Sequence, residues 1–289
     1  MWFFLSLASS FLYSFRRVSE KKLTHKADSF TLGFAAQAFS LPAITLLLFF
    51  TPIPNLFSLS GNFWYPLLII WLILYPLQAY FYYKSIKEGE ISYVLPLASL
   101  IPIFTTLTSW ILIHEIPSLF GFLGIFAITT GIYILNMKPK THILNPVIHL
   151  FKYKPSFYMI INCACLATGA TLDKIAIHAS NPFFYTFINT LGATIILLIF
   201  ARITNPKFHI DVKTNSKGFT VLGLLQSVAF TLYITALNTG VVAYVTAIKS
   251  ANAILASIWG FIFLKESINK YKVVALCFIF AGLISIAFA

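Results

Sequence analysis

The stretch that decides the fold is residues 82–136, YYKSIKEGEISYVLPLASLIPIFTTLTSWILIHEIPSLFGFLGIFAITTGIYILN, because it recurs 151 residues further along the chain. The second copy, residues 233–287, is YITALNTGVVAYVTAIKSANAILASIWGFIFLKESINKYKVVALCFIFAGLISIA. The two align without a gap, and ten of the 55 pairs are identical, among them Tyr82/Tyr233, Gly89/Gly240, Tyr93/Tyr244, Ser99/Ser250, Glu115/Glu266 and Gly131/Gly282. Apolar bias alone does not explain glycines, tyrosines and glutamates that match at the ends of apolar runs. The pattern therefore indicates an internal repeat.

The composition of the whole chain is that of a membrane protein. Of its 289 residues, 59% are hydrophobic and only 10% are charged, whereas soluble domains carry roughly a quarter charged residues. Apolar runs close to the roughly 20 residues that cross a bilayer recur from end to end. They predict an all-α polytopic membrane protein with about ten transmembrane helices, near residues 2–20, 30–51, 63–84, 91–113, 118–137, 157–178, 182–203, 217–238, 241–264 and 269–288.

The longest polar break, residues 138–155, divides the chain into two halves. We expect a first five-helix repeat over residues 1–137 and a second over residues 156–289, joined by this linker. Because each half has an odd number of helices, the second copy must enter the membrane upside down relative to the first. The expected architecture is therefore the inverted repeat found in many secondary transporters.

The basic residues indicate the orientation of the chain in the membrane. The loops after helices 1, 3, 5, 7 and 9 hold 18 of the 20 Lys and Arg, whereas the loops on the other side hold only Lys174 and a helix holds Lys249. The positive-inside rule then places the basic loops in the cytoplasm and both termini outside. Because these residues face lipid headgroups, the net charge of +12 does not indicate nucleic-acid binding. We expect a multi-pass protein of the cell inner membrane.

Two segments of the repeat carry a resemblance to a known family. The first half contains EGEISYVLPLASLIP followed by IHEIPSLFGFLGIFAITTGIYIL, and the second half ends in a similar segment with Glu266 at a helix turn and Gly282 in the last helix. This order resembles the drug/metabolite transporter superfamily, in particular its EamA-type ten-helix proteins. The resemblance implies transport of metabolites such as amino acids, nucleotide sugars, sugar phosphates or cofactors without ATP hydrolysis. The chain also lacks a GxxxxGK[ST] phosphate-binding loop.

Lys249 is the first candidate for substrate binding, because it lies near the middle of the predicted helix 241–264. A buried ammonium at that depth costs roughly 2.5–3.5 kcal/mol, and such intramembrane charges usually mark a transport pathway. Thr246, Lys249 and Asn252 share one helical face by their three-residue spacing. The resemblance strengthens this hypothesis, because in phosphate-translocating relatives a basic residue of the matching helix binds the substrate anion. The alternative is a lysine that snorkels to the interface.

Polar residues on two other helices are the remaining candidates. Tyr75, Gln78 and Tyr82 on the third helix, and Gln226 and Tyr233 on the eighth, repeat at three, four or seven residues. They could line the same cavity from both halves of the chain. The tyrosines could instead belong to the aromatic belt at the membrane interface, whereas the two buried amides need polar partners.

The acidic residues are expected to have structural roles. Glu115 and Glu266 match in the repeat and lie at helix ends, which favours capping of the turn over a role in coupling. Asp173 and Lys174 are interpreted as a solvated pair at a helix end. No Asp or Glu then lies deep within an apolar run, so we expect that protonation of a mid-membrane carboxylate does not drive transport.

These observations favour a secondary transporter or exchanger that works by alternating access between its two halves. The expected substrate is an amino acid, a nucleotide-type compound or a phosphorylated or carboxylated metabolite. One alternative, a membrane-embedded lipid or prenyl transferase, needs paired carboxylates or a His/Asp set, and no acidic pair occurs at helical spacing in an apolar run. A non-catalytic membrane assembly protein is the other alternative. We expect an anionic small-molecule substrate and membrane lipids as partners, no nucleic acid, no cofactor and no metal, and leave homodimer formation open.

Overall fold

The computed structural model describes residues 1–23, 26–49, 51–55, 59–89, 94–135, 153–252, 254–255, 259 and 270–289. These residues form helices joined by turns, without a strand. Six of the described helices are long and apolar enough to cross a membrane, and two further apolar helices are shorter. The predicted all-α polytopic membrane fold is therefore confirmed.

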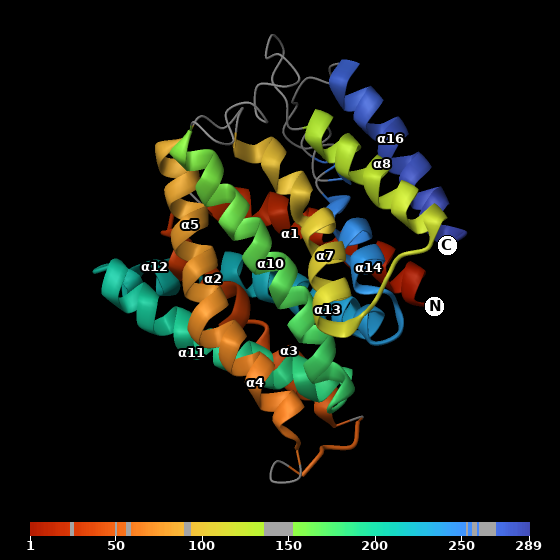
Figure 1. The fold of residues 1–289 in the computed structure, drawn as a ribbon. Helices are drawn as coiled ribbons and strands as arrows, with labels where there is room; N and C mark the ends of the chain where they lie inside the picture. Colours follow the sequence, from red (N-terminus) through yellow and green to blue (C-terminus); the bar gives the residue numbers. More distant parts are fainter. Residues whose placement is uncertain are drawn as a thin grey trace. The chain divides into compact units, whose positions relative to one another are not determined.

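The described helices follow the predicted order (Figure 1). They are α1 (Trp2–Leu23), α2 (Ser29–Ala38), α3 (Leu41–Leu48), α4 (Gly61–Ile69), η2 (Ile70–Leu74), α5 (Tyr75–Glu88), η3 (Leu95–Leu100), α7 (Ile101–Ile113), α8 (Leu119–Leu135), α10 (Lys154–His178), α11 (Pro182–Thr204), α12 (Phe208–Thr214), α13 (Ser216–Thr239), α14 (Val242–Ser250) and α16 (Lys270–Ala287). The bounds of α10, α11, α13 and α16 differ from the predicted ranges by three residues or fewer. The short helix α12 lies where the sequence predicted a loop.

The chain forms two compact units, and each contains helices from both halves. Unit 1 comprises residues Met1–Tyr75 and Leu172–Thr239, and unit 2 comprises Pro76–Thr171 and Gly240–Ala289. The chain passes between the units three times: at the start of α5, within α10, and between Thr239 and Gly240, where α13 is followed by α14. The two repeats of the sequence are therefore not the two compact units.

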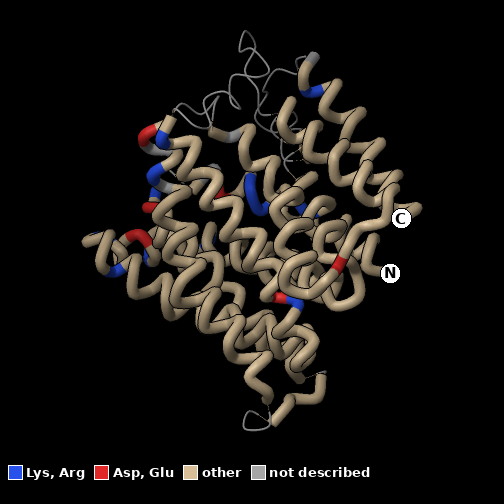
Figure 2. The backbone as a smooth tube through the Cα atoms, viewed as in Figure 1, with Lys and Arg blue, Asp and Glu red and all other residues tan. Residues whose placement is uncertain are grey.

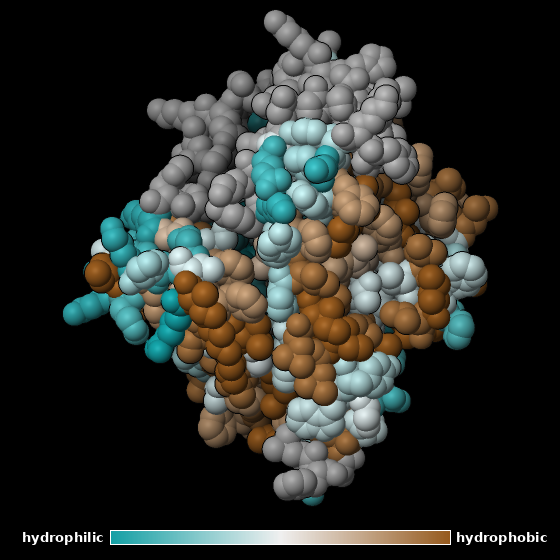
Figure 3. Space-filling view, turned by 60° about the vertical axis from the view of Figure 1, so that its left-hand side comes forward, coloured by the Kyte–Doolittle hydropathy of each residue, from teal (hydrophilic) through white to brown (hydrophobic). Residues whose placement is uncertain are grey.

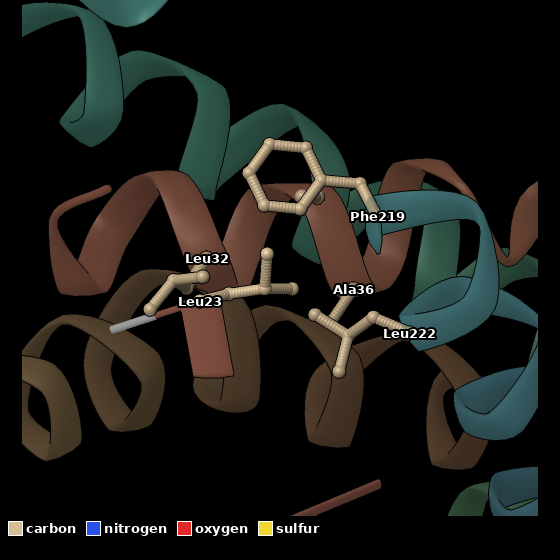
Figure 4. Packing of buried hydrophobic residues seen from close by; sticks show 6 residues of the cluster. Leu23, Leu32, Ala36, Phe219 and Leu222 are labelled. Carbon is tan, nitrogen blue, oxygen red and sulfur yellow. The ribbon is translucent and has the colours of Figure 1, made fainter. Parts of the chain in front are cut away.

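In unit 1, a hydrophobic cluster joins the ends of three helices. It contains Leu23 from α1, Leu32 and Ala36 from α2, and Phe219 and Leu222 from α13 (Figure 4). All five side chains are buried. Burial of each large apolar side chain stabilises a soluble fold by roughly 1.5–3 kcal/mol, and at a membrane surface this cluster excludes water from the helix ends. It fixes the register of α1 and α2 against α13.

Unit 2 shows the inverted repeat directly in the packing of α8 against α16 (Figure 1). A Cβ at Gly124 would lie 2.8 Å from the backbone oxygen of Gly282, and a Cβ at Gly131 would lie 2.9 Å from that of Ala275. Because the residue numbers rise along one helix and fall along the other, the two helices are antiparallel. The shift of 151 residues exchanges Gly124 with Ala275 and Gly131 with Gly282, so it maps this pair of contacts onto itself.

A second pair of repeat-equivalent helices is antiparallel in unit 1. The start of α2 lies beside the end of α11, where Asp28 Oδ1 accepts a hydrogen bond of 3.0 Å from Asn205 Nδ2 and Asp28 Oδ2 accepts one of 3.4 Å from Thr204 Oγ1. Asp28 also caps α2, because its carboxylate accepts from the backbone N–H groups of Phe30 and Thr31. Repeat-equivalent helices that run in opposite directions are what an inverted repeat requires.

Two of the predicted helices are interrupted beside prolines. The helix expected at 30–51 breaks between α2 and α3, because Pro42 in the first turn of α3 has no N–H with which to continue the helix. At the break, the hydroxyl of Ser40, the residue before α3, donates a hydrogen bond of 2.7 Å to the backbone carbonyl of Gln37. In the helix expected at 91–113, Pro96 lies in the first turn of the 3₁₀ helix η3, and Pro102 lies in the first turn of α7, which follows it.

The third predicted helix contains a π-helical turn where the chain leaves unit 1. In η2 the backbone N–H of Tyr75 bonds to the carbonyl of Ile70, five residues back. Pro76 follows at once and cannot donate a backbone hydrogen bond. The π-helical turn therefore lies directly before the position at which the helix lacks a backbone N–H donor. Single π-helical turns inside α-helices are frequent at functional sites.

Apolar side chains cover the outward faces of the long helices. On α13, Val221, Leu224 and Val228 are exposed and share one face by three- and four-residue spacing, whereas Leu222 and Gln226 are buried. Such apolar outward faces suit a lipid environment. Figure 3 shows a broad apolar band on the face that it presents. Figure 2 shows that charged residues gather mainly at helix ends and on α12.

Candidate functional site

Asp173 and Lys174 lie inside a helix that can span the membrane. The candidate span covers Lys154–His178, which places Asp173 five residues, or roughly 7–8 Å, before the end of α10. Lys174 has only 6% of its surface exposed. The interpretation as a solvated pair is therefore wrong. Within the described candidate spans Asp173 is the one acidic residue, and transport without protonation of a mid-membrane carboxylate stays a prediction.

A tyrosine from another helix contacts the Asp173 carboxylate in unit 1. The hydroxyl of Tyr185 on α11 donates a hydrogen bond to Asp173 Oδ1. Tyr13 on α1 and Tyr233 on α13 are buried in the same unit, and Tyr75 at the start of α5 is half-buried there. We call these five residues the Asp173 cluster. Its members lie up to 220 positions apart in the sequence.

Asn189 on α11 attaches a tryptophan to this cluster. Its Oδ1 accepts hydrogen bonds from Trp71 Nε1 at 3.0 Å and from the Tyr75 hydroxyl at 3.5 Å. The indole can lie against α11 because Gly192 has no side chain, since a Cβ at Gly192 would be 2.2 Å from the Trp71 ring. The indole N–H of Trp71 and the hydroxyl of Tyr75 therefore both bond to the buried side-chain amide of Asn189. These two hydrogen bonds fix the orientation of both rings.

Gln226 lies at the level of Tyr13 in the antiparallel pair α1 and α13. Two contacts set this register: a Cβ at Gly218 would touch the last residue of α1, and Ser9 Oγ donates to the carbonyl of Ala229 at 2.8 Å. Interpolation between these contacts places Tyr13 opposite Gln226. Gln226 is buried, and its Oε1 has no hydrogen-bond partner among the described residues. The predicted candidates Gln226, Tyr75 and Tyr233 thus belong to the same unit as the Asp173 cluster.

Arg16 approaches Tyr13 from one helical turn further along α1. Its guanidinium carbon is 5.9 Å from the centroid of the Tyr13 ring, and its Nη2 forms an ion pair of 3.5 Å with Glu20. Tyr13 is buried and Arg16 is partly exposed, so the guanidinium lies at the edge of the buried part of unit 1.

The Lys249 candidates lie in unit 2. Lys249 is partly exposed in the last turn of α14, whereas Thr246 and Asn252 are buried. The Thr246 hydroxyl donates to the carbonyl of Val242 at 2.9 Å, and the Asn252 amide donates to the carbonyl of Lys249. Asn252 Oδ1 has no hydrogen-bond partner in the described part of the chain. Binding of a substrate anion by these residues stays a prediction.

Glu115 caps the start of α14, a helix of the other half, whereas the sequence favoured capping of the turn at its own helix end. Its Oε2 accepts a hydrogen bond of 3.0 Å from the backbone N–H of Val242, the first residue of that helix. Beside this cap the hydroxyl of Tyr244 accepts a hydrogen bond of 2.7 Å from the backbone N–H of Ser118. The two contacts join the segment between α7 and α8 to the start of α14. Glu266 lies outside the described residues.

The two remaining candidates, Gln78 and Tyr82, belong to unit 2. Tyr82 is 48% exposed, and Gln78 is half-buried, in contrast to the buried Gln226 and Tyr233 of unit 1. That these four residues line one cavity stays a prediction. The described residues contain no group of three or more His, Cys, Asp or Glu that could hold a metal ion.

Three comparisons relate the chain to known proteins. The family model of the EamA-like transporter family matches residues 1–137 and 154–288. A protein of Sinorhizobium sp., described as an uncharacterized transporter in the cobO 3′ region, is 26% identical over 136 residues, which make up 45% of this chain and 94% of that protein. A solved crystal structure matches with a TM-score of 0.75 and 14% identity over 99% of this chain and 96% of that chain, a likeness of fold alone. Because the family model matches both halves, the chain is a membrane transporter that belongs to the EamA-like transporter family.

Proposed function

We propose that the protein is a secondary transporter or exchanger that moves a small metabolite across the cell inner membrane by alternating access. The observation that carries the proposal is the division into two compact units, each built from helices of both repeats. Rocking of one such bundle against the other is how inverted-repeat transporters expose a site to each side in turn.

The places where the chain passes between the units support this motion. One crossing follows the π-helical turn η2 and lies between Tyr75 and Pro76. A proline and a π-helical turn both weaken the regular hydrogen-bond ladder of a helix, so bending is easier there than in an uninterrupted helix. A second crossing lies between Thr171 and Leu172, directly before Asp173, and a third lies between Thr239 and Gly240, where α13 is followed by α14. Tyr75 and Asp173 are thus close in sequence to the first two crossings.

The anionic substrate predicted from Lys249 remains part of the proposal. An ammonium on a membrane helix binds a substrate carboxylate or phosphate through charge-assisted hydrogen bonds, and the unsatisfied Asn252 Oδ1 could accept from the same substrate. A structural explanation competes with this role. Lys249 lies in the last turn of α14, where a cation stabilises the helix dipole by about 0.3–1 kcal/mol.

The test is counterflow in proteoliposomes that contain the purified full-length protein and a panel of labelled metabolites. We expect a substrate that is loaded inside to accelerate uptake of the same labelled substrate from outside. A transferase would instead yield a covalent product, and an assembly protein would give neither result. Absence of counterflow for every compound, with protein shown to be folded and inserted, would refute the transport proposal.

A paired substitution tests the proposed bending at η2. Pro76→Ala restores a backbone donor at the crossing, so we expect slower exchange with unchanged substrate binding. Pro66→Ala is the matched control, because Pro66 lies in the same candidate span but inside α4 of unit 1. Equal exchange rates for both variants and the wild type would show that this crossing does not limit the motion.

A further inference from the structure

We infer that the adjoining ends of α5 and α10 bind the phosphate group of an anionic phospholipid, through the Lys84 ammonium held between the rings of Tyr80 and Tyr158. None of these three residues was a candidate for substrate binding. The inference gives the membrane lipids expected as partners a headgroup chemistry and a position on the protein. It holds for any transported metabolite.

The two helix ends are joined by buried contacts within unit 2. Ser85 Oγ on α5 donates a hydrogen bond of 2.8 Å to the backbone carbonyl of Pro155 on α10, and both residues are buried. A Cβ at Gly89 would lie 2.7 Å from the Pro155 side chain, so the two helices approach closely. The rings of Phe81 and Tyr158 have centroids 5.8 Å apart. These contacts fix the position of Tyr158 relative to α5.

The Lys84 ammonium lies where the two helices meet. Its Nζ donates a hydrogen bond of 3.1 Å to the Tyr80 hydroxyl, and it lies 5.3 Å from the centroid of the Tyr80 ring and 5.0 Å from that of the Tyr158 ring. Both distances are within the about 6 Å of a cation–π interaction. An ammonium has three N–H donors, so donors remain for a ligand. Lys84 forms no ion pair with any described residue, although Glu88 lies one turn further along α5.

The level of this ammonium in the bilayer indicates a lipid as the ligand. Lys84 follows the candidate span Gly61–Tyr82 by two residues, and Tyr158 lies four residues after the start of the span Lys154–His178. The ends of membrane spans lie at the level of the headgroups. The positive-inside rule places this end on the cytoplasmic side, where anionic lipids give the leaflet a negative surface potential.

The surface beside the ammonium suits the apolar part of a lipid. One face of α5 carries Leu77, Tyr80 and Lys84, which follow one another at three- and four-residue spacing, and both Leu77 and Tyr80 are exposed. A phospholipid has an anionic phosphate directly above its acyl chains. Its two parts therefore match the ammonium and the apolar side chain below it, whereas a soluble phosphate matches the ammonium alone.

The experiment measures binding of phosphatidylglycerol to the purified full-length protein in detergent by native mass spectrometry. Phosphatidylcholine is the comparison lipid, because its headgroup carries a cation beside the phosphate, and inorganic phosphate is the soluble competitor. We expect phosphatidylglycerol to bind about 10-fold more tightly than phosphatidylcholine, the gain from one charge-assisted hydrogen bond. Inorganic phosphate should not displace it. Equal binding of both lipids, or displacement by inorganic phosphate, would overturn the inference.

Substitutions of lysine distinguish this site from general attraction to a basic surface. Lys84→Gln should weaken phosphatidylglycerol binding by about 10-fold, and Lys84→Arg should retain it because the charge is kept. Lys213→Gln is the matched control, since it removes one exposed charge from α12 on the same predicted side of the membrane, and it should bind nearly like the wild type. All variants are compared at matched melting temperature. An equal loss in Lys84→Gln and Lys213→Gln would show that only general attraction acts.

A substitution of tyrosine tests the site without a change in net charge. Tyr158→Leu removes one of the rings that hold the ammonium, so it should weaken phosphatidylglycerol binding by about 2- to 5-fold. Phe126→Leu is the control, because it removes an exposed aromatic ring from α8 of the same unit, and it should leave binding unchanged. Binding by Tyr158→Leu that equals the wild type would show that the ammonium needs no ring to bind the lipid, and would overturn the proposed site.

Discussion

The substitution Gly282→Ala tests the inverted-repeat packing of α8 against α16. A Cβ at this position would lie 2.7 Å from the backbone oxygen of Gly124 and 3.0 Å from the backbone nitrogen of Ile128. Backbone atoms cannot rotate away, so the helices must separate. Overpacking of this kind costs typically 1–3 kcal/mol, and the better helix propensity of alanine returns roughly 1 kcal/mol. The expected net loss is about 1 kcal/mol, or roughly 2–4 °C in melting temperature for a chain of this size.

The assay is thermal unfolding of purified protein in detergent, followed by intrinsic fluorescence. Gly131→Ala should cause a similar loss, because Gly131 is the repeat equivalent of Gly282 and a Cβ there meets the Ala275 backbone oxygen at 2.9 Å. The two contacts are about 10 Å apart along the helix, so the double variant should show the sum of both losses. Gly61→Ala is the control, since a Cβ at Gly61 meets nothing within 4 Å. If Gly282→Ala melts no lower than Gly61→Ala, the close crossing is wrong.

The other predictions concern charge and orientation. Lys249→Ala should abolish transport of an anionic substrate while the protein still inserts, and Lys249→Arg should retain part of it because the guanidinium is wider and planar; wild-type rates in proteoliposomes for Lys249→Ala would assign a structural role. Asp28→Ala should lower the unfolding free energy by about 0.5–2 kcal/mol, because α2 loses its cap, and an unchanged melting curve would contradict this. Glu115→Gln keeps an acceptor for Val242, so it should transport normally, and loss of activity would indicate a coupling role. A reporter fused at Ala289 should lie outside, and a cytoplasmic signal would reverse the orientation.

Most of the helices could be predicted because their limits depend on local chemistry. α11 begins where Asn181 precedes Pro182, and the Asn181 side chain accepts from the backbone N–H of Phe184 at 2.9 Å. Such caps and breakers are visible in a few consecutive residues. The break before α3 had the same kind of signal in Pro42, but the continuous apolar run concealed it. A continuous apolar run indicates that a segment faces lipid. It does not indicate whether the backbone of that segment forms one helix or two.

The Asp173 cluster could not be predicted, because its members come into one unit only through tertiary packing. Tyr75 and Tyr233 were identified as candidates from their spacing, whereas Tyr13 and Tyr185 lie in apolar runs where a tyrosine has no distinguishing neighbours. The error on Asp173 had a local cause. The predicted helix extends to His178, which places Asp173 one and a half turns inside it, whereas the charged pair Asp173-Lys174 on its own favours a helix end. Depth counted from the predicted helix end was the missed signal.

The organisation of the chain gives the repeat a further consequence for folding. α1 of the first half packs along α13 of the second, α2 packs along α11, and α8 packs along α16. Each of these pairs joins segments that are more than 130 residues apart, so neither compact unit can form until both halves have been inserted. The matched glycines at positions 131 and 282 allow α8 and α16 to pack closely once both halves are inserted. Close antiparallel crossings need small residues on both helices. The internal repeat therefore encodes the pairing of the two halves with each other, and the linker at 138–155 joins partners in packing without separating two independent domains.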